Sequence, residues 1–160
     1  MLGVQLALGM ETAPLHALVQ GAGVALRVPA GVFRKELARS DALRRCVNRY
    51  LYVLMRQLAI AAPCLRFHLI GQRLARWLLM SEDRAHATTF EVTQEFLAYM
   101  LGVRRAGVTV AASGLKDAGL VDYHRGFVTV LDRKGLEAAA CECYAGDRAA
   151  YSQALGSAKA

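Results

Sequence analysis

Polar side chains recur at helical spacing in the second half of the chain, at Arg105, Thr109, Ser113 and Lys116, with Arg104 directly before them. Residues three or four positions apart lie on one face of a helix, so these side chains point the same way. An arginine at the start of such a helix can bond to O6 and N7 of guanine in the major groove of DNA, while hydroxyl groups and a second arginine can hold phosphates. The pattern therefore predicts a face that reads DNA, and the alternative is a solvated polar face without a partner.

Two further pairs of residues extend this predicted face. Ala106 and Val110 lie on the same side of the helix and cannot donate hydrogen bonds, but they can meet the methyl groups of thymine. His124 and Arg125 stand before Gly126 at the expected tip of a hairpin, from which they can touch the DNA backbone or the minor groove. The alternative for this second pair is an ordinary polar hairpin tip.

Cysteine and histidine are the other residues that could carry chemistry. The sequence has no GxSxG, Walker, HExxH or GxGxxG motif, and its four histidines are scattered. Cys141 and Cys143 are expected on one helix, where their thiols would point about 200° apart, a poor arrangement for a shared metal. We therefore expect no enzyme, no metal site and no cofactor. A structural or incidental role is expected for the cysteines, with redox sensing as the alternative.

The segment around residues 88–119 has the pattern of a helix-turn-helix. Residues 88–92 alternate like a strand, and Thr93 can cap the helix that follows. That helix ends at Gly102, and the helical pattern restarts at Arg105, which leaves room for a turn of about three residues. Small and apolar residues face inward on the second helix, namely Val108, Ala111, Ala112, Leu115 and Gly119. Two short helices across a glycine-bearing turn are typical of this DNA-binding motif.

A hairpin and a last helix complete the expected domain. Residues 120–123 and 127–131 form two β-type runs on either side of Gly126. Asp132 can cap a final helix. Its inward face is expected to carry Leu136, Ala139, Ala140, Cys143 and Tyr144. An amphipathic helix is also expected over residues 67–81, before the first strand. The order of strand, helix-turn-helix and hairpin predicts a winged helix.

A longer helix is predicted from Ser40 to about Ala62, where Pro63 should stop it. Apolar residues on this helix repeat at alternating steps of four and three, which is the spacing of a heptad seam. The residues expected to pair with a second copy are Leu43, Val47, Tyr50, Leu51, Leu54 and Leu58. The alternative is an ordinary amphipathic core helix. We favour pairing because the flanking sequence offers little else to bury this stripe.

The first part of the chain has a different character. Residues 4–8 and 15–28 are rich in Val, Leu and Ala and are interrupted by glycines, which predicts short strands joined by tight turns. Two or three strands cannot bury both of their faces, so we expect the remnant of a larger sheet or a segment that packs on something else. Pro29 is expected to open a short helical turn through Leu37.

Length and composition are compatible with this division. The 160 residues allow one domain, or a small domain beside a fragment of another. The net charge of +7 and the pI of about 9.6 suit a polyanionic partner. Charge alone does not locate that partner, because residues 1–63 carry eight Lys or Arg against three Asp or Glu, and residues 64–160 carry twelve against ten. We expect no membrane segment and no secretory signal, and four cysteines that stay reduced in the cytoplasm.

Four stretches of the sequence, residues 67–80, 92–98, 101–105 and 132–137, resemble the Crp/Fnr family of bacterial transcription regulators. The resemblance is strongest between residues 63 and 144, and the match at residues 101–105 falls on the turn of the predicted winged helix. It implies a homodimer that is paired through the long helix and binds a palindromic operator with half-sites about one helical turn apart. It also implies RNA polymerase as a further partner.

The resemblance assigns roles to single residues. Arg105 matches the guanine-reading arginine of the family, while Thr93 and Arg104 match positions that touch phosphates. Val110 departs from the family, in which a basic or polar residue is frequent at this place, so contact at that base step is not implied.

The chain departs most from the family at its start. Family members carry an N-terminal cyclic-nucleotide-binding β-roll, of which residues 1–35 resemble only the closing strands. Cyclic-AMP-binding members place an Arg-Ser pair on the phosphate where this chain has Ala13-Pro14. The cysteines that hold an iron–sulfur centre in oxygen-sensing members lie in the part that is missing here. Neither cofactor is therefore expected.

Together these observations predict an α+β chain with a C-terminal winged helix-turn-helix domain, a long dimerisation helix before it, and the last strands of a truncated β-roll. The predicted divisions are residues 1–36, 37–62 and 63–145, followed by a frayed tail at 146–160. The predicted function is sequence-specific binding of double-stranded DNA by a homodimeric transcription regulator. The alternative is an interaction protein that does not bind DNA but dimerises with a full-length relative and titrates it.

Overall fold

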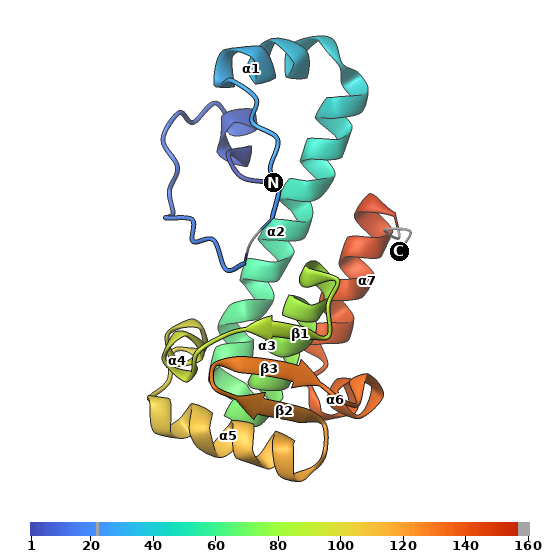
Figure 1. The fold of residues 1–160 in the computed structure, drawn as a ribbon. Helices are drawn as coiled ribbons and strands as arrows, with labels where there is room; N and C mark the ends of the chain where they lie inside the picture. The colour runs from blue at the N-terminus through green and yellow to red at the C-terminus, as the bar shows by residue number, and fades with distance from the viewer. Residues whose placement is uncertain (22, 157–160) are drawn as a thin grey trace. The chain divides into compact units, whose positions relative to one another are not determined.

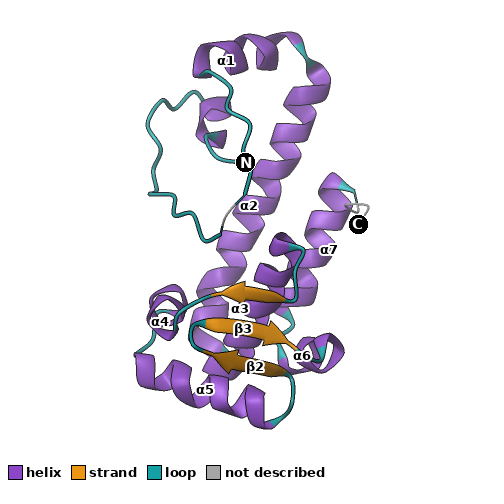
Figure 2. Cartoon of the chain, in the orientation of Figure 1, coloured by secondary structure: helices purple, strands orange, loops and turns teal. Residues whose placement is uncertain are grey.

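The computed structural model describes residues 1–21 and 23–156 and divides into two compact units. One unit comprises residues 1–56 together with the end of the chain from residue 149, and the other comprises residues 57–148. Helices predominate, and the strands form one small sheet in the second unit (Figure 1, Figure 2). This mixed architecture confirms the expected α+β class, while the predicted domain boundaries at residues 36, 62 and 145 stay predictions.

The N-terminal segment forms no strand in its described residues, so the prediction for residues 4–8 and 15–28 is wrong. Val4–Leu8 forms a 3-10 helix, η1, between Gly3 and Gly9, whose φ angles are 80° and 79°. The other described residues up to 28 form a loop with exposed apolar side chains. A strand is stable only when its backbone N–H and C=O groups pair with a neighbour, and the described chain offers this segment no neighbouring strand.

Two helices follow this loop. α1 (Ala30–Arg39) starts directly after Pro29, as predicted. α2 (Asp41–Phe67) starts after Ser40, whose Oγ accepts a hydrogen bond from the Leu43 N–H at 3.2 Å. This bond confirms Ser40 as the N-cap, since a side-chain oxygen there satisfies an otherwise unpaired N–H of the first turn.

The predicted end of the long helix is wrong, because α2 continues through Pro63 to Phe67. Proline removes one backbone hydrogen bond, but its fixed φ is compatible with a helix, so the loss stays local when the next residues are held in place. They are held here because Cys64 is buried and its carbonyl accepts a hydrogen bond from the His68 N–H at 3.2 Å.

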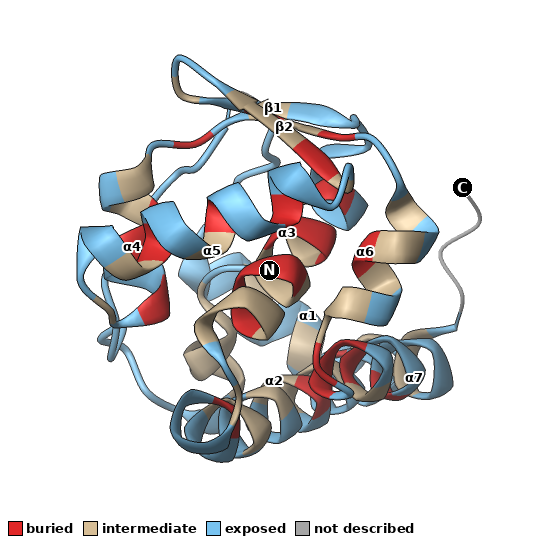
Figure 3. Ribbon diagram, turned by 90° about the horizontal axis from the view of Figure 1, so that it is seen from below, coloured by how far each residue is buried: buried red, intermediate tan, exposed pale blue. Residues whose placement is uncertain are grey.

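The second unit is built around α3 (Ile70–Ala85), which contributes many of its buried side chains (Figure 3). The largest fully buried side chains of the unit come from helices and strands alike: Leu74, Leu78, Leu79, Leu97, Val108, Val121, Val128 and Leu136. α3 runs past the predicted end at Ser81. The added turn is held because Glu82 is buried and its Oε2 lies 2.7 Å from Nη1 of Arg133.

The sheet has three antiparallel strands in the order β1 (Thr89–Glu91), β3 (Phe127–Val130) and β2 (Val121–His124). β2 and β3 form a hairpin in which Arg125 and Gly126 have φ angles of 48° and 85°. Between β1 and β2 lie α4 (Gln94–Leu101) and α5 (Arg105–Asp117). This order confirms the predicted strand, helix-turn-helix and hairpin of a winged helix.

The predicted last helix is broken in two. α6 (Arg133–Ala139) is capped by Asp132, whose Oδ1 accepts a hydrogen bond from the Gly135 N–H at 3.0 Å. It ends because Ala140 has extended backbone, with φ −75° and ψ 157°. α7 (Cys143–Leu155) begins only after a turn. The prediction that Cys141 and Cys143 share one helix is therefore wrong.

The frayed tail expected after Gly146 is not observed, because α7 continues to Leu155. Its early part is anchored by Asp147, which is buried and whose Oδ2 lies 2.6 Å from Nη2 of Arg76. Ala150, one turn later, is also buried. The remainder of the predicted tail, residues 157–160, lies outside the described chain.

Candidate nucleic-acid interface

α4 and α5 are joined by a tight turn that follows from their end residues. At the start of α4, Thr93 Oγ1 accepts a hydrogen bond from the Phe96 N–H at 3.1 Å. At its end, Gly102 has a φ of 61°, in the left-handed region that glycine adopts without strain. α5 then starts at Arg105. The helix-turn-helix predicted from the sequence is therefore present with the predicted cap, turn and restart.

α5 has one buried and one exposed side, as its sequence predicts. Val108, Ala112 and Leu115 are buried. The exposed residues include the predicted DNA-reading positions Arg105, Ala106, Thr109, Val110, Ser113 and Lys116. Gly107 lies so close to α3 that a Cβ added there would be 3.0 Å from Cδ1 of Ile70. Close packing on the core thus holds the polar side of α5 toward solvent (Figure 3).

Arg104 and Arg105 place two positive charges at the start of α5. Both are exposed, and neither side chain forms a hydrogen bond or an ion pair with another residue in 1–21 or 23–156. Arg105 lies near the phenol of Tyr123, where burial raises the pKa of the phenol and the arginine charge opposes that rise. A guanidinium group without a partner in the chain is free to bind a phosphate or a guanine in a bidentate manner.

Two of the predicted contact residues already have partners in the chain. Thr109 Oγ1 donates a hydrogen bond to Gln94 Oε1 at 2.8 Å, and Lys116 Nζ lies 2.8 Å from Asp122 Oδ1. The hydrogen bond and the charge of Lys116 lower the pKa of Asp122. Both members of the ion pair are about half exposed, so a phosphate can replace the carboxylate with little loss of stability. This pair could not be predicted from the sequence, because its members lie on different elements.

The hairpin presents His124 and Arg125 at its exposed tip, as predicted. Its place is fixed at the end of β1, because Tyr123 Oη donates a hydrogen bond to the Val92 carbonyl at 2.7 Å. The Val92 N–H in turn donates to the Gly126 carbonyl at 2.7 Å. The tip therefore projects from a fixed base, which is the arrangement that a wing needs if it is to contact DNA.

Sequence reasoning missed the charged cluster that joins α6 to α3. Arg133 donates hydrogen bonds to Glu82 Oε2 and Asp83 Oδ1, both at 2.7 Å. Burial lowers the pKa of Arg133, but the hydrogen bond and charge of Asp83 outweigh it, so the guanidinium stays charged. Burial and the hydrogen bond to Asp83 raise the pKa of Tyr144 to about 12. The cluster ties the start of α6 to the end of α3.

The residues predicted for dimerisation lie along α2 with different exposures. Leu43, Tyr50, Leu51 and Leu54 are half-buried, Val47 is 3% exposed, and Leu58 is 66% exposed. Val47 is thus already covered within the chain. Tyr50 Oη accepts a hydrogen bond from the amino group of Met1 at 2.9 Å. Large exposed apolar side chains of α2 other than Leu58 include Tyr52, Met55 and Leu65.

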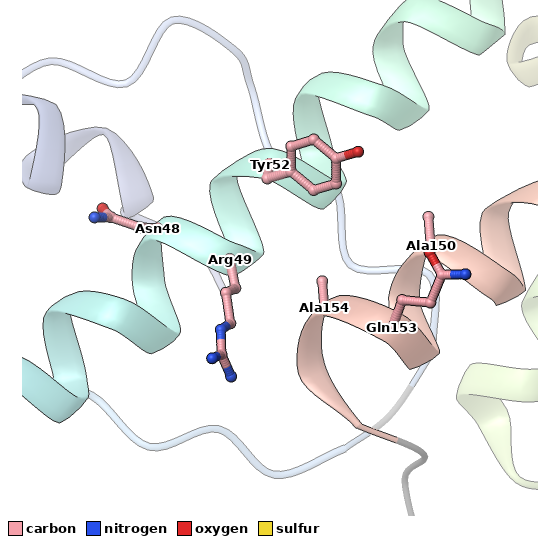
Figure 4. Close-up of a pocket in the computed structure, with 6 residues that line it drawn as sticks. All are labelled: Asn48, Arg49, Tyr52, Ala150, Gln153 and Ala154. Atoms are coloured by element: carbon pink, nitrogen blue, oxygen red, sulfur yellow. The ribbon is translucent and has the colours of Figure 1, made fainter.

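A hollow of about 400 Å³ lies within the first unit, between α2 and the end of α7 (Figure 4). It is lined by Asn48, Arg49, Tyr52, Ala150, Gln153 and Ala154. Among the described residues, this lining contains one charged group and two carboxamides, and no carboxylate, histidine or cysteine. It therefore supplies no group that could exchange a proton near neutral pH, and we assign it no chemistry.

Comparison with known proteins agrees with this geometry. Residues 72–139 match the family model of the Crp-like helix-turn-helix domain. A solved structure described as a Crp/Fnr-family transcriptional regulator from Eubacterium rectale has a TM-score of 0.52 and 24% identity, over 69% of this chain and 51% of its own. The Catabolite Activator Protein of Thermus thermophilus has a TM-score of 0.43 and 21% identity, over 73% of this chain and 53% of its own. No curated protein matches this chain.

The chain spans about half the length of these two solved proteins. The family match falls on the winged helix. No helix in the described ranges 1–21 and 23–156 is long and apolar enough to cross a membrane. Residues 72–139 of this chain match the Crp-like helix-turn-helix domain, and the fold resembles that of a Crp/Fnr regulator.

Proposed function

We propose that the chain is a transcription regulator that binds double-stranded DNA as a homodimer and places α5 in the major groove of each half of a palindromic operator. The observation that carries this proposal is the exposed side of α5, where two arginines have no partner in the described chain. A Crp-like helix-turn-helix domain supports it. A helix that is packed on a core by one side and offers donors on the other is the arrangement that major-groove reading requires.

In this proposal each exposed residue has a role that its side chain can perform. Arg105 reads guanine, and Arg104 and Thr93 bind phosphates at the start of α5 and α4. Ala106 and Val110 contact thymine methyl groups. The other predicted contacts come from the polar groups of α5 and the wing tip: Thr109, Ser113, Lys116, His124 and Arg125. Thr109 keeps its bond to Gln94 and accepts from a donor on DNA, while Lys116 exchanges Asp122 for a phosphate.

The homodimer is the second element of the proposal. A palindromic operator is read by two copies related by a two-fold axis, and α2 offers exposed apolar side chains for such pairing. Of the predicted set, Leu58 is exposed and available for pairing, whereas Val47 is buried within the chain. RNA polymerase is the expected further partner at a promoter, and the cytoplasm is the expected location.

A second candidate function rests on the exposed apolar side chains of α2. The chain could pair through them with a longer relative and titrate it without binding DNA itself. The two functions differ in their salt dependence. Six to ten phosphate contacts weaken DNA binding about 10³- to 10⁵-fold between 50 and 200 mM salt, whereas an apolar helix pair responds little.

The deciding experiment selects bound duplexes from a random pool with the purified chain, while light scattering gives its mass in solution. We expect a two-fold symmetric motif that Arg105→Ala relaxes at one base pair, with affinity reduced by about 1–3 kcal/mol. Arg39→Ala, which removes one exposed charge from α1, is the matched control and should leave the motif unchanged. A folded dimer that enriches no motif would support the titrating function instead.

A further inference from the structure

Three cysteines and one histidine meet in the second unit, away from the exposed side of α5. The ligand atoms of Cys64, His68, Cys141 and Cys143 all lie within 4.8 Å of one another. Two of the separations are resolved individually: Cys64 Sγ is 3.7 Å from Cys141 Sγ, and Cys143 Sγ is 3.6 Å from His68 Nδ1. No other group of three or more Cys, His, Asp or Glu in 1–21 or 23–156 is gathered in this way.

The backbone explains how these residues come together. Cys64 and His68 are four positions apart, so they lie on one face of the last turn of α2 and its extension, where the His68 N–H bonds to the Cys64 carbonyl at 3.2 Å. Cys141 lies in the turn before α7, and Cys143 is the first residue of α7. The Tyr144 N–H donates to the Cys141 carbonyl at 3.0 Å, which tightens this turn. The thiols that a continuous helix would point apart are thereby directed to one place.

We propose that Cys64, His68, Cys141 and Cys143 bind a single Zn²⁺ ion in a tetrahedral site. Zn–S bonds of about 2.3 Å and Zn–N bonds of about 2.0–2.1 Å, at tetrahedral angles, put neighbouring sulfurs about 3.8 Å apart and sulfur about 3.6 Å from nitrogen. The two separations given above agree with both values. Soft thiolates with one imidazole favour Zn²⁺ over Mg²⁺ or Ca²⁺, which take oxygen ligands.

The groups around the four ligands suit such an ion. Nε2 of His68 lies 3.0 Å from Glu142 Oε1, so Nδ1 is left to face the metal while the other ring nitrogen donates to a carboxylate, as is usual for zinc-bound histidine. Three thiolates and one Zn²⁺ carry a net charge of −1. Arg76 lies beside them, with Nη1 3.3 Å from Cys64 Sγ, and its position is fixed by Asp147.

Other readings of the cluster explain fewer of its members. A disulfide between Cys64 and Cys141 would not explain why Cys143 and the His68–Glu142 pair lie beside these two thiols. An iron–sulfur cluster interposes several iron and sulfide atoms, so its ligands stand farther apart than the ligands of one ion. The three cysteines are 2%, 3% and 9% exposed, and four protein ligands leave no open position. The site is therefore of the structural type, joining the end of α2 to the segment after α6.

The test measures metal in the full chain, purified under reducing conditions. Elemental analysis should find one zinc per chain, and Co²⁺ added after chelation should give the intense visible bands of a tetrahedral thiolate complex. Cys141→Ser and Cys143→Ser should lose stoichiometric binding and these bands. Cys46→Ser, which alters the exposed fourth cysteine, should retain both. Glu142→Gln should keep the tetrahedral spectrum but weaken Zn²⁺ binding by about 10- to 100-fold.

Three results would overturn the proposal. They are a wild-type chain that takes up no zinc or cobalt, iron with acid-labile sulfide in place of zinc, and a Cys64–Cys141 disulfide in chain kept under air-free conditions. Unfolding of a serine variant does not remove the test, because the wild-type stoichiometry and the Co²⁺ spectrum need no variant. Unchanged binding in a folded Cys141→Ser variant would also contradict the assignment of that ligand.

Discussion

Residues 1–29 and residues 57–148 are both rich in apolar side chains, but they bury them to very different extents. In the N-terminal segment none of the described residues is buried, and Leu26 is 97% exposed. In the second unit Leu79 is fully buried among side chains of α3, the sheet and the neighbouring helices. The same residue type is thus in solvent in one region and in a core in the other.

An apolar pattern forms a core only when a complementary surface is available to pack against it. In the second unit the amphipathic elements have such surfaces, and α5 packs on α3. The ring centroid of Trp77 lies 6.5 Å from that of Phe90 and 6.1 Å from that of Phe96. In the N-terminal segment, Val4–Leu8 satisfies its backbone locally as a 3-10 helix, and the loop after it pairs with no strand. Four matched pairs of substitutions test this contrast.

The largest contrast is expected for the two leucines. Leu79→Ala should lower the free energy of unfolding by about 2–5 kcal/mol, because it removes buried methyl groups and leaves a cavity. Leu26→Ala should change it by less than about 0.5 kcal/mol, because the side chain is already in water. Urea denaturation of the full chain, followed by circular dichroism, measures both. Equal effects would mean that Leu26 is covered in solution, for instance by a second copy.

The next contrast compares two ion pairs. Arg133→Met leaves the carboxylate of Glu82, which is 9% exposed, without its partner. Because Arg133 itself is 36% exposed, we expect the free energy of unfolding to fall by about 2 kcal/mol rather than by the full cost of breaking a buried pair. Arg34→Met breaks an exposed pair with Glu11 and should change stability by less than about 0.5 kcal/mol. The same denaturation measurement applies. A larger effect for Arg34→Met would show that the N-terminal segment is held more firmly than its exposure implies.

A smaller contrast concerns two glycines. Gly102→Ala puts a side chain at φ 61° in the turn between α4 and α5 and should destabilise the chain by about 1–2 kcal/mol. Gly21 does not have a positive φ and has open space around it, so Gly21→Ala should be neutral or slightly stabilising. Thermal unfolding midpoints report the two directions. A stabilised Gly102→Ala variant would contradict the geometry of the turn.

The smallest effect is expected at Asp122. Its pKa in the folded chain is lowered by Lys116, so this pair adds stability above the unfolded pKa of aspartate and loses it as the pH falls through the lower, folded value. In Asp122→Asn the free energy of unfolding should therefore decrease less between about pH 5 and pH 2 than in the wild type. Glu11→Gln in the N-terminal segment serves as the control. Lys116 then binds a phosphate without first leaving Asp122, so DNA affinity should also rise slightly. A variant with the wild-type acid dependence would show that the pair contributes nothing.

The winged helix could be predicted from the sequence because its signals are local. The Thr93 cap, the Gly102 turn, the apolar side of α5 and the hairpin at Gly126 each depend on residues within a few positions of one another, and the structure confirms all four. The exposed face of α5 follows from helical periodicity alone. The pairs Lys116–Asp122 and Arg133–Glu82 could not be predicted in this way, since their partners lie on other elements.

The start of most helices and the inward side of α5 follow from local signals in the sequence, because capping groups, glycine conformations and apolar spacing act over a single turn. Three other features depend on contacts beyond the local sequence. α2 continues through Pro63, residues 4–8 form a helix, and Cys141 leaves the helix and joins Cys64, His68 and Cys143. Those outcomes depend on which surfaces are available to pair with a segment or to hold a turn in place. That information is spread over residues as far apart as Cys64 and Cys141, so no local pattern contains it.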